Sequence, residues 1–255
     1  MRRMDSHFGY AEYADAMSPG VLDLHAAARN KSLILSSEGI DVRDSSAVNL
    51  LGAQTLDFQM WLPAAAVEYR ISPNVQDYVL TPVLTIPTEL PNRNCVGFPR
   101  RELVKFNIEA GRLAYKTFIG KPVHVEHDNE DPTKAIGVIV DSVLRPTRGY
   151  GAGRMHRLFK LLAVDRTKNP MMAQKIIDRE VNTYSMGAWV KSFECSYCGA
   201  PMGRCSHLHP NRPRDFYELM GRLVYRWCIG VNGFETSVVF DPAYSVAASD
   251  ILFGL

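Results

Sequence analysis

Residues 122–144 read PVHVEHDNEDPTKAIGVIVDSVL. Two segments of this stretch, 122–126 and 135–144, are rich in β-branched residues and predict strands. The polar residues 128–132 between them, which end in a proline, predict a loop. The stretch therefore predicts two neighbouring strands, with His127 at the point where the first strand ends.

The same patterns extend over most of the chain. Further strand signals lie at 69–71, 79–86, 158–164, 181–190 and 234–240, and residues 215–227 fit a helix or a strand equally well. A helix is expected over 101–118, between Pro99 and Gly120, and a second one from the capping pair Asn169-Pro170 to residue 180. Many short strands with few helices predict an α+β, β-rich fold with a mixed barrel or sheet.

The first 55 residues differ from the rest of the chain. They mix Ser, Asp, Ala and Gly with short apolar stretches and show no sustained periodicity. We expect a flexible leader, similar to a propeptide, at 1–55 and one folded domain at 56–255.

The amino-acid composition limits the classes of protein to which the chain can belong. The chain has 255 residues, 46% of them hydrophobic, which is enough to bury the core of a globular enzyme. With 29 Lys and Arg against 27 Asp and Glu, the net charge of +2 gives no reason to expect a nucleic-acid partner. No run approaches the roughly 18 apolar residues of a membrane span, and the first 20 residues lack the apolar stretch of a signal peptide. These features predict a soluble protein made in the cytoplasm, with no membrane partner.

Three of the five cysteines lie close together in the sequence. Cys195 and Cys198 form a C-x2-C turn, and Cys205 and His207 follow it. This spacing is typical of zinc sites, so an insertion at about 193–210 is expected to bind Zn²⁺. His209 is the alternative fourth ligand, and unliganded thiols are the alternative to a metal. Four protein ligands leave no position for water, so the zinc would be structural. No structural disulfide is expected.

Three residues are candidates for catalysis. His127 is placed to act as a general base, because the reference pKa of histidine lies near neutral pH. Ser185, in the Ser-Met-Gly segment of a strand, could expose a nucleophilic hydroxyl. Glu235 interrupts an apolar strand and could orient the base. Taken singly, each has an ordinary structural explanation: a surface histidine, a strand serine and a strand glutamate that faces solvent.

The order of these segments resembles the motifs of the phage prohead (head maturation) serine proteases, which share a fold with the herpesvirus assemblin proteases. The matching residues are His127-Asp128 with Ile136-Gly137-Val138-Ile139, then Ser185-Met186-Gly187, then Glu235-Thr236-Ser237-Val238-Val239 with Pro242-Ala243. The resemblance covers roughly residues 70–248. It implies an assemblin-like β-barrel with peripheral helices and a small zinc-binding insertion.

The resemblance also implies a function and a set of roles. Ser185 would be the nucleophile, His127 the base and Glu235 the third member of the triad, with His207, His209 and Asp241 as rivals for that third role. The Arg-Arg pair of the herpesvirus branch is missing, so the oxyanion donors would be backbone N–H groups near Met186 and Gly187, or Arg222 or Arg226.

The expected enzyme is an endopeptidase inside the phage prohead, made in the host cytoplasm. Its substrates would be scaffold and major capsid proteins, cut after Glu, and a homodimer is a further expectation. Ser36-Ser37-Glu38 resembles a self-cleavage site, with a polar leader loop as the alternative. The rival functions are a non-enzymatic, zinc-stabilised structural protein of the phage head and, less favoured because the metal site looks closed, a zinc-dependent hydrolase.

Overall fold

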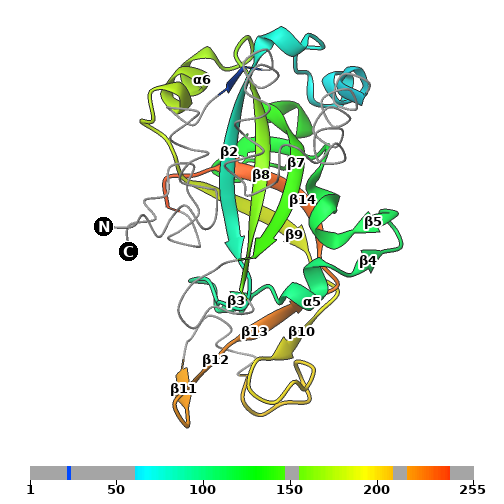
Figure 1. Cartoon of the computed structure of the whole chain (residues 1–255), viewed down its shortest axis with the longest axis vertical. Helices are drawn as coiled ribbons and strands as arrows, with labels where there is room; N and C mark the ends of the chain where they lie inside the picture. Colours follow the sequence, from blue (N-terminus) through cyan, green and yellow to red (C-terminus); the bar gives the residue numbers. More distant parts are fainter. Residues whose placement is uncertain (1–21, 24–60, 147–154, 209–216, 242–255) are drawn as a thin grey trace, which may run out of the picture.

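The computed structural model describes residues 22–23, 61–146, 155–208 and 217–241 (Figure 1). Within these residues, seven strands form the main sheet: β1 Leu22–Asp23, β2 Tyr78–Pro87, β6 Pro122–Val125, β7 Gly137–Pro146, β8 His156–Asp165, β9 Tyr184–Trp189 and β14 Asn232–Val238. Their order across the sheet is β1-β2-β8-β7-β6-β14-β9. β6 and β14 run parallel, and the other neighbouring pairs are antiparallel.

The three long strands β2, β8 and β7 form the largest part of this sheet (Figure 1). Leu158 and Leu162 of β8 are fully buried while Phe159 and Leu161 between them are less so, which is the period of two of a strand with one face in the core. β2 and β9 contact each other although they lie far apart in the strand order. The sheet therefore curls into a half-barrel, and the expectation of a β-rich fold with few helices is confirmed.

A second, smaller sheet extends from the lower end of the main sheet in Figure 1. Its order is β10-β13-β3, with bounds β10 Ser192–Cys195, β13 Arg226–Ile229 and β3 Val96–Gly97. Two hairpins are separate from both sheets: β4 Phe106–Asn107 with β5 Arg112–Leu113, and β11 Tyr217–Leu219 with β12 Arg222–Val224. Of the two alternatives for residues 215–227, strand is therefore correct for the part that the structure describes.

Helices are short and lie outside the sheets. Residues 61–69 are helical, and α6 spans Pro170–Ile177. The Asn169 side chain accepts a hydrogen bond from Met172 N at 3.0 Å, which is the N-cap that the sequence predicts. Tyr69 ends the first helix, so the strand predicted at 69–71 is wrong. The remaining helices are α5 Arg100–Leu103 and the 3₁₀ helices η2 Val75–Asp77, η3 Ala114–Phe118 and η4 Pro132–Lys134.

The helix predicted over 101–118 is also wrong. α5 ends at Leu103, and the β4–β5 hairpin takes the place of its middle. Asn107 Oδ1 accepts a hydrogen bond from Ala110 N at 3.0 Å, and Gly111 has a φ of 64°. Such a side-chain turn competes with helical hydrogen bonding. Phe106 and Ile108 are exposed, so the apolar residues that suggested a helix do not form one buried stripe.

The expected leader lies largely outside the described residues, as does the candidate cleavage site at Ser36-Ser37-Glu38. Its one described segment, Leu22–Asp23, pairs with Leu80 and Val79 at the edge of the main sheet. Two residues of the expected leader therefore contribute to the folded sheet.

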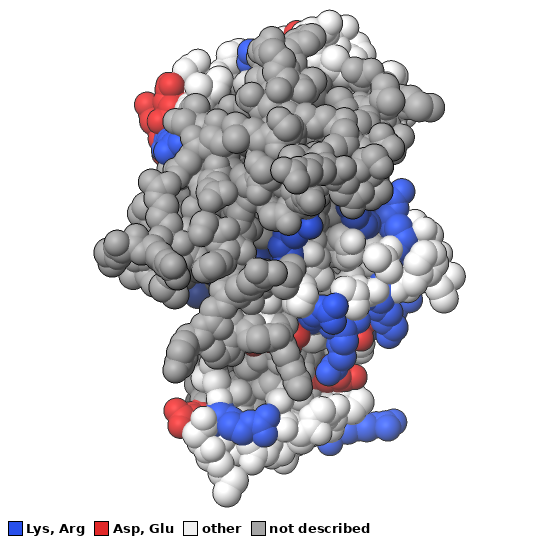
Figure 2. All heavy atoms as spheres, viewed as in Figure 1, with Lys and Arg blue, Asp and Glu red and all other residues white. Residues whose placement is uncertain are grey.

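Both signs of charge occur on the face shown in Figure 2, where described basic side chains gather at the middle right of the view. Several described charges are paired across elements, for example Arg101 with Glu194 at 2.6 Å and Lys191 with Glu109 at 3.0 Å. None of the helices in the described residues is long and apolar enough to cross a membrane.

Candidate functional site

Glu235 is the buried carboxylate of the candidate catalytic site. It lies in β14 with 0% exposure. Its Oε1 is 2.5 Å from His127 Nδ1, and its Oε2 accepts a hydrogen bond from the Ser237 hydroxyl at 2.7 Å. A buried carboxylate is costly without such partners. The structural alternative, a glutamate that faces solvent, is therefore wrong for Glu235.

His127 lies just beyond the end of β6. Glu126 and His127 have φ values of 51° and 59°, so the strand alternation stops at Val125 and does not determine the direction of the His127 side chain. The His127 backbone N–H donates to Ser237 Oγ at 3.2 Å, which holds the turn against β14. Because a carboxylate only accepts, Nδ1 carries the hydrogen in the contact with Glu235 and Nε2 is left as the basic nitrogen.

Ser185 lies on the neighbouring strand, β9. It stands directly opposite Ser237 in the antiparallel β9–β14 pair. Opposite residues carry their side chains on the same face, with Cβ atoms about 4.5–5.5 Å apart. Glu235 lies two residues before Ser237 and so shares this face. The register thus places Ser185 beside the His127–Glu235 pair, although among the described residues no hydrogen bond joins its hydroxyl to His127.

A pocket of about 240 Å³ brings the two residues together, since both His127 and Ser185 line it. One wall is formed by β9, which also contributes Met186 and Ala188. The small sheet contributes one lining residue from each of its strands: Val96, Phe193 and Cys228. The pocket therefore lies where the main sheet meets the small one.

The contact between the two charged partners sets their protonation. Burial alone would raise the pKa of Glu235, but the hydrogen bonds from His127 and Ser237 outweigh it and lower that pKa. The same hydrogen bond to Glu235 raises the pKa of His127 above 6.5, against the opposing effect of burial. Burial lowers the pKa of His124, which lies on β6. The carboxylate therefore stabilises the protonated His127 imidazole, as proton transfer from a serine requires.

The rivals for the third triad position lie elsewhere. His207 lies beside Cys205 in the cysteine cluster, with Nδ1 3.4 Å from that sulfur. Asp241 is exposed and forms an ion pair with Arg93 at 2.6 Å. His209 lies outside the described residues. Of the candidates for this position that the structure describes, only Glu235 forms a hydrogen bond with the His127 ring.

The two arginines considered as oxyanion donors lie against aromatic rings. The guanidinium of Arg222 lies 5.1 Å from the ring centroid of Tyr197, and that of Arg226 lies 5.0 Å from the ring centroid of Phe193. Neither lines the pocket, whereas Met186 does. The backbone near Met186 and Gly187 remains the prediction for this role.

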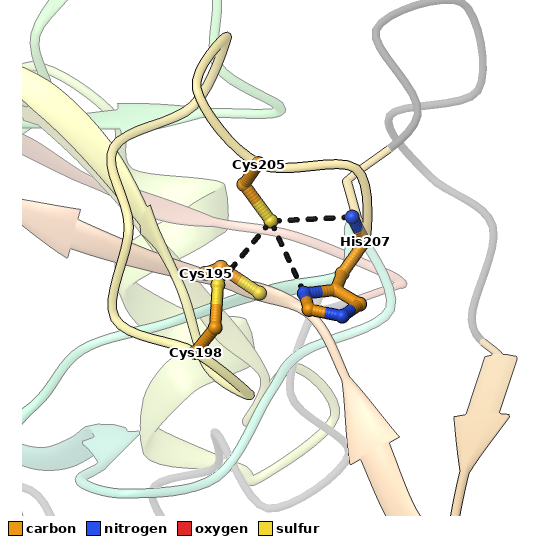
Figure 3. A group of neighbouring side chains, drawn as sticks. All are labelled: Cys195, Cys198, Cys205 and His207. Carbon is orange, nitrogen blue, oxygen red and sulfur yellow. Dashed lines mark hydrogen bonds between the residues drawn. The ribbon is translucent and has the colours of Figure 1, made fainter.

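The cysteine cluster is the second candidate site. Its four donor atoms, from Cys195, Cys198, Cys205 and His207, all lie within 4.8 Å of one another (Figure 3). Cys195 ends β10 and is buried, and the three other ligands come from the loop that follows (Figure 3). The turn closes through Gly199, whose N–H donates to the Cys195 carbonyl at 2.9 Å and whose φ is 74°.

These donors can hold a metal ion. Cys205 Sγ lies 3.4 Å from Cys198 Sγ and 3.4 Å from His207 Nδ1, and none of the five cysteines, all of which the structure describes, forms a disulfide. Around a tetrahedral zinc with Zn–S bonds of about 2.3 Å, ligand atoms lie roughly 3.8 Å apart. The separations suit a closed, four-ligand metal site.

Two residues of the catalytic region were not identified from the sequence. Ser237 bridges His127 and Glu235, and the signal for it was the period of two that puts residues 235 and 237 on one face of a strand. Lys160 is buried in β8 and donates to Thr236 Oγ1 at 2.8 Å. Its only sequence signal was a lysine within an apolar strand.

In comparisons with known proteins, no family model matches this chain, and no curated protein and no solved structure matches it significantly.

Proposed function

We propose that the chain is a serine endopeptidase of the phage prohead-maturation type, which cleaves scaffold and capsid proteins and itself inside the assembling head. The observation that carries the chemistry is the 2.5 Å contact between His127 Nδ1 and Glu235 Oε1, next to a pocket that Ser185 lines. The three motifs in their order support the assignment to phage heads. The alternative, a non-enzymatic structural protein of the head, keeps the same fold without cleavage.

The proposed mechanism is acyl transfer. Ser185 Oγ attacks the scissile carbonyl and passes its proton to His127 Nε2, and Glu235 holds the imidazole in the tautomer that leaves Nε2 free. His127 then returns the proton to the leaving amine, and water repeats the sequence to release the acyl group. The mechanism requires Ser185 Oγ and His127 Nε2 to reach hydrogen-bond distance, and catalytic hydrogen bonds often tighten only when substrate binds.

The experiment compares wild type with Ser185→Ala, each incubated with purified scaffold or capsid protein. Wild type is expected to cut the substrate and to process its own chain, and Ser185→Ala is expected to do neither. Ser192→Ala, a change at an exposed serine outside the pocket, is the matched control and should behave as wild type. Identical band patterns for wild type and Ser185→Ala would reject the protease and favour the structural protein.

We propose further that the metal of the cysteine cluster is a structural Zn²⁺. Three thiolates and one imidazole form a donor set that zinc prefers, and four protein ligands leave no open position for a substrate or a reactive water. The ion would join the end of β10 to the loop after it. A zinc-dependent hydrolase is disfavoured for the same reason.

Metal analysis of the purified protein tests this proposal. We expect about one zinc per chain in wild type and strong loss of it in Cys195→Ser. Cys228→Ser is the matched control, because Cys228 is also buried but lies outside the cluster. Full zinc content in Cys195→Ser would rule out the ligand set.

A further inference from the structure

The pocket beside Ser185 has a chemical character that bears on substrate choice. Apolar residues are the largest group among those that line it: Val96, Phe98, Met186, Ala188, Val190 and Phe193. Its polar side chains include Asn92 and Asn94. No Lys, Arg, Asp or Glu is among the described residues that line it.

Charged residues that lie next to the lining residues already have partners, such as Arg93, which pairs with Asp241 at 2.6 Å. Arg226 lies against the Phe193 ring, and its Nη2 donates to the Asn94 carbonyl at 3.0 Å. Glu194 pairs with Arg101 at 2.6 Å. Glu235 is buried and already accepts a hydrogen bond from His127. Apart from His127, which must be neutral to act as the base, none of the described residues that line the pocket offers a charge to a carboxylate or an ammonium.

The two asparagines that line the pocket are uncharged, and Asn92 already accepts hydrogen bonds from the backbone. Asn92 Oδ1 accepts hydrogen bonds from the backbone N–H groups of Asn94 at 2.9 Å and of Val96 at 3.3 Å. The Asn92 side chain therefore holds the loop that leads into β3, and this loop forms the rim of the pocket. Cys228, which also lines the pocket, is nearly inaccessible to solvent, and burial raises the pKa of its thiol to about 12, so it brings no charge either.

We infer that this pocket receives an uncharged side chain next to the scissile bond, of about the size of Leu, Met or Gln. The inference rests on the proposed protease function, and it departs from the cleavage after Glu that the motif resemblance implies. A carboxylate placed in this pocket would lose its hydration without gaining a cationic partner, which disfavours it strongly. An apolar or amide side chain exchanges water for the apolar walls instead.

Cleavage-site mapping tests the inference. The full chain is incubated with a denatured mixture of cellular proteins, and new termini are identified by mass spectrometry, with Ser185→Ala as background. One of the two positions that flank the cut bond is expected to be depleted about 100-fold in Asp, Glu, Lys and Arg. A dominance of Glu at either position, or charged residues as frequent there as elsewhere, would overturn the inference while leaving the protease intact.

A variant with a new charge sharpens the test. Asn94 is exposed at the rim of the pocket, so Asn94→Lys should fold and should admit Asp and Glu at the depleted position about 10-fold more often. Asn74→Lys, also at an exposed asparagine but outside the pocket, is the matched control and should keep the wild-type pattern. An unchanged pattern in Asn94→Lys would show that the pocket does not contact the residue at the cut bond. No cleavage by wild type at all would reject the proposed function, and this inference with it.

Discussion

The proposed catalytic mechanism depends on the contact between the side chains of His127 and Glu235. Glu235 has no solvent exposure, and its two oxygens are taken by His127 and Ser237. In the serine-protease mechanism the carboxylate fixes the imidazole tautomer and stabilises the imidazolium ion. At this scale each role depends on single atoms, so single substitutions test it.

Glu235→Gln is expected to lower kcat by roughly 10³–10⁴-fold, because the amide no longer selects the tautomer with a free Nε2. It should also change the pH profile. Glu235 raises the pKa of His127 above 6.5. Because the base must be unprotonated, wild-type kcat/KM should rise with pH through a pKa above that value. In Glu235→Gln this rise should move to lower pH.

The matched control is Glu126→Gln. Glu126 also raises the pKa of His127 by its charge, more weakly and without a hydrogen bond to the ring. This variant should keep most of its activity and show a smaller shift of the pH profile. An unshifted profile in Glu235→Gln would contradict the assigned contact.

Lys160 allows a test of stability at the same scale. Its amine donates to Thr236 Oγ1 and lies 3.5 Å from the ring centroid of Phe118, and burial lowers its pKa well below 10.5. The unfolded chain therefore binds a proton that the folded chain does not. As pH falls below 10.5, the free energy of unfolding should decrease with a slope of up to about 1.4 kcal/mol per pH unit, until the lowered pKa is reached.

Lys160→Met should remove this part of the pH dependence and raise stability at neutral pH, which urea unfolding at a series of pH values measures. Lys105→Met, at an exposed lysine, should leave the pH dependence as in wild type. A lower stability of Lys160→Met at neutral pH would show that Lys160 is charged and paired in the folded chain.

At the scale of elements, the β9–β14 pair determines which residues meet. Its register sets Ser185 opposite Ser237 and Gly187 opposite Glu235. A Cβ on Gly187 would lie 2.3 Å from Phe234 Cζ and 2.7 Å from Glu235 Cγ. Because Gly187 has no side chain, the Glu235 side chain can pack closely against β9.

Gly187→Ala is expected to destabilise the protein by about 1–3 kcal/mol and to reduce kcat, because the added methyl group displaces Glu235. Thermal unfolding and peptide cleavage would be measured together. Gly111→Ala is the control: it strains a φ of 64° in open space in the β4–β5 hairpin, so it should cost about 1 kcal/mol without loss of kcat. Full activity in Gly187→Ala would contradict the role of this close approach.

For the whole molecule, the two candidate sites are joined by the small sheet. β10 carries Phe193, which lines the pocket, two residues before the candidate metal ligand Cys195. The cysteine cluster thus lies at the end of a strand that contributes a lining residue to the pocket. Metal binding and substrate binding should be linked through this strand.

Removal of the metal by a chelator is expected to lower the unfolding temperature and to raise KM more than it lowers kcat. With free metal at about 1,000 times its Kd, the apparent stabilisation lost is about 4 kcal/mol. Cys195→Ser should not respond to the chelator. Unchanged KM and unfolding temperature after complete metal removal would show that the cluster does not support the pocket.

The amino-acid sequence by itself determined the local features. The strands at 79–86, 135–144, 158–164 and 234–240, the Asn169 cap and the grouping of three cysteines with His207 follow from patterns that are complete within a few residues. Where local patterns compete, as in the hairpin at Asn107 to Gly111, the sequence predicted the wrong element.

Only the tertiary structure decided how the distant residues meet. The burial of Glu235, its contact with His127, the bridge through Ser237 and the neutral lining of the pocket depend on strand register and on the turn after Val125, over separations of about a hundred residues. Periodicity gives the face of each residue but not its partner across the sheet, because pairing is a property of two strands and of the core that both must cover.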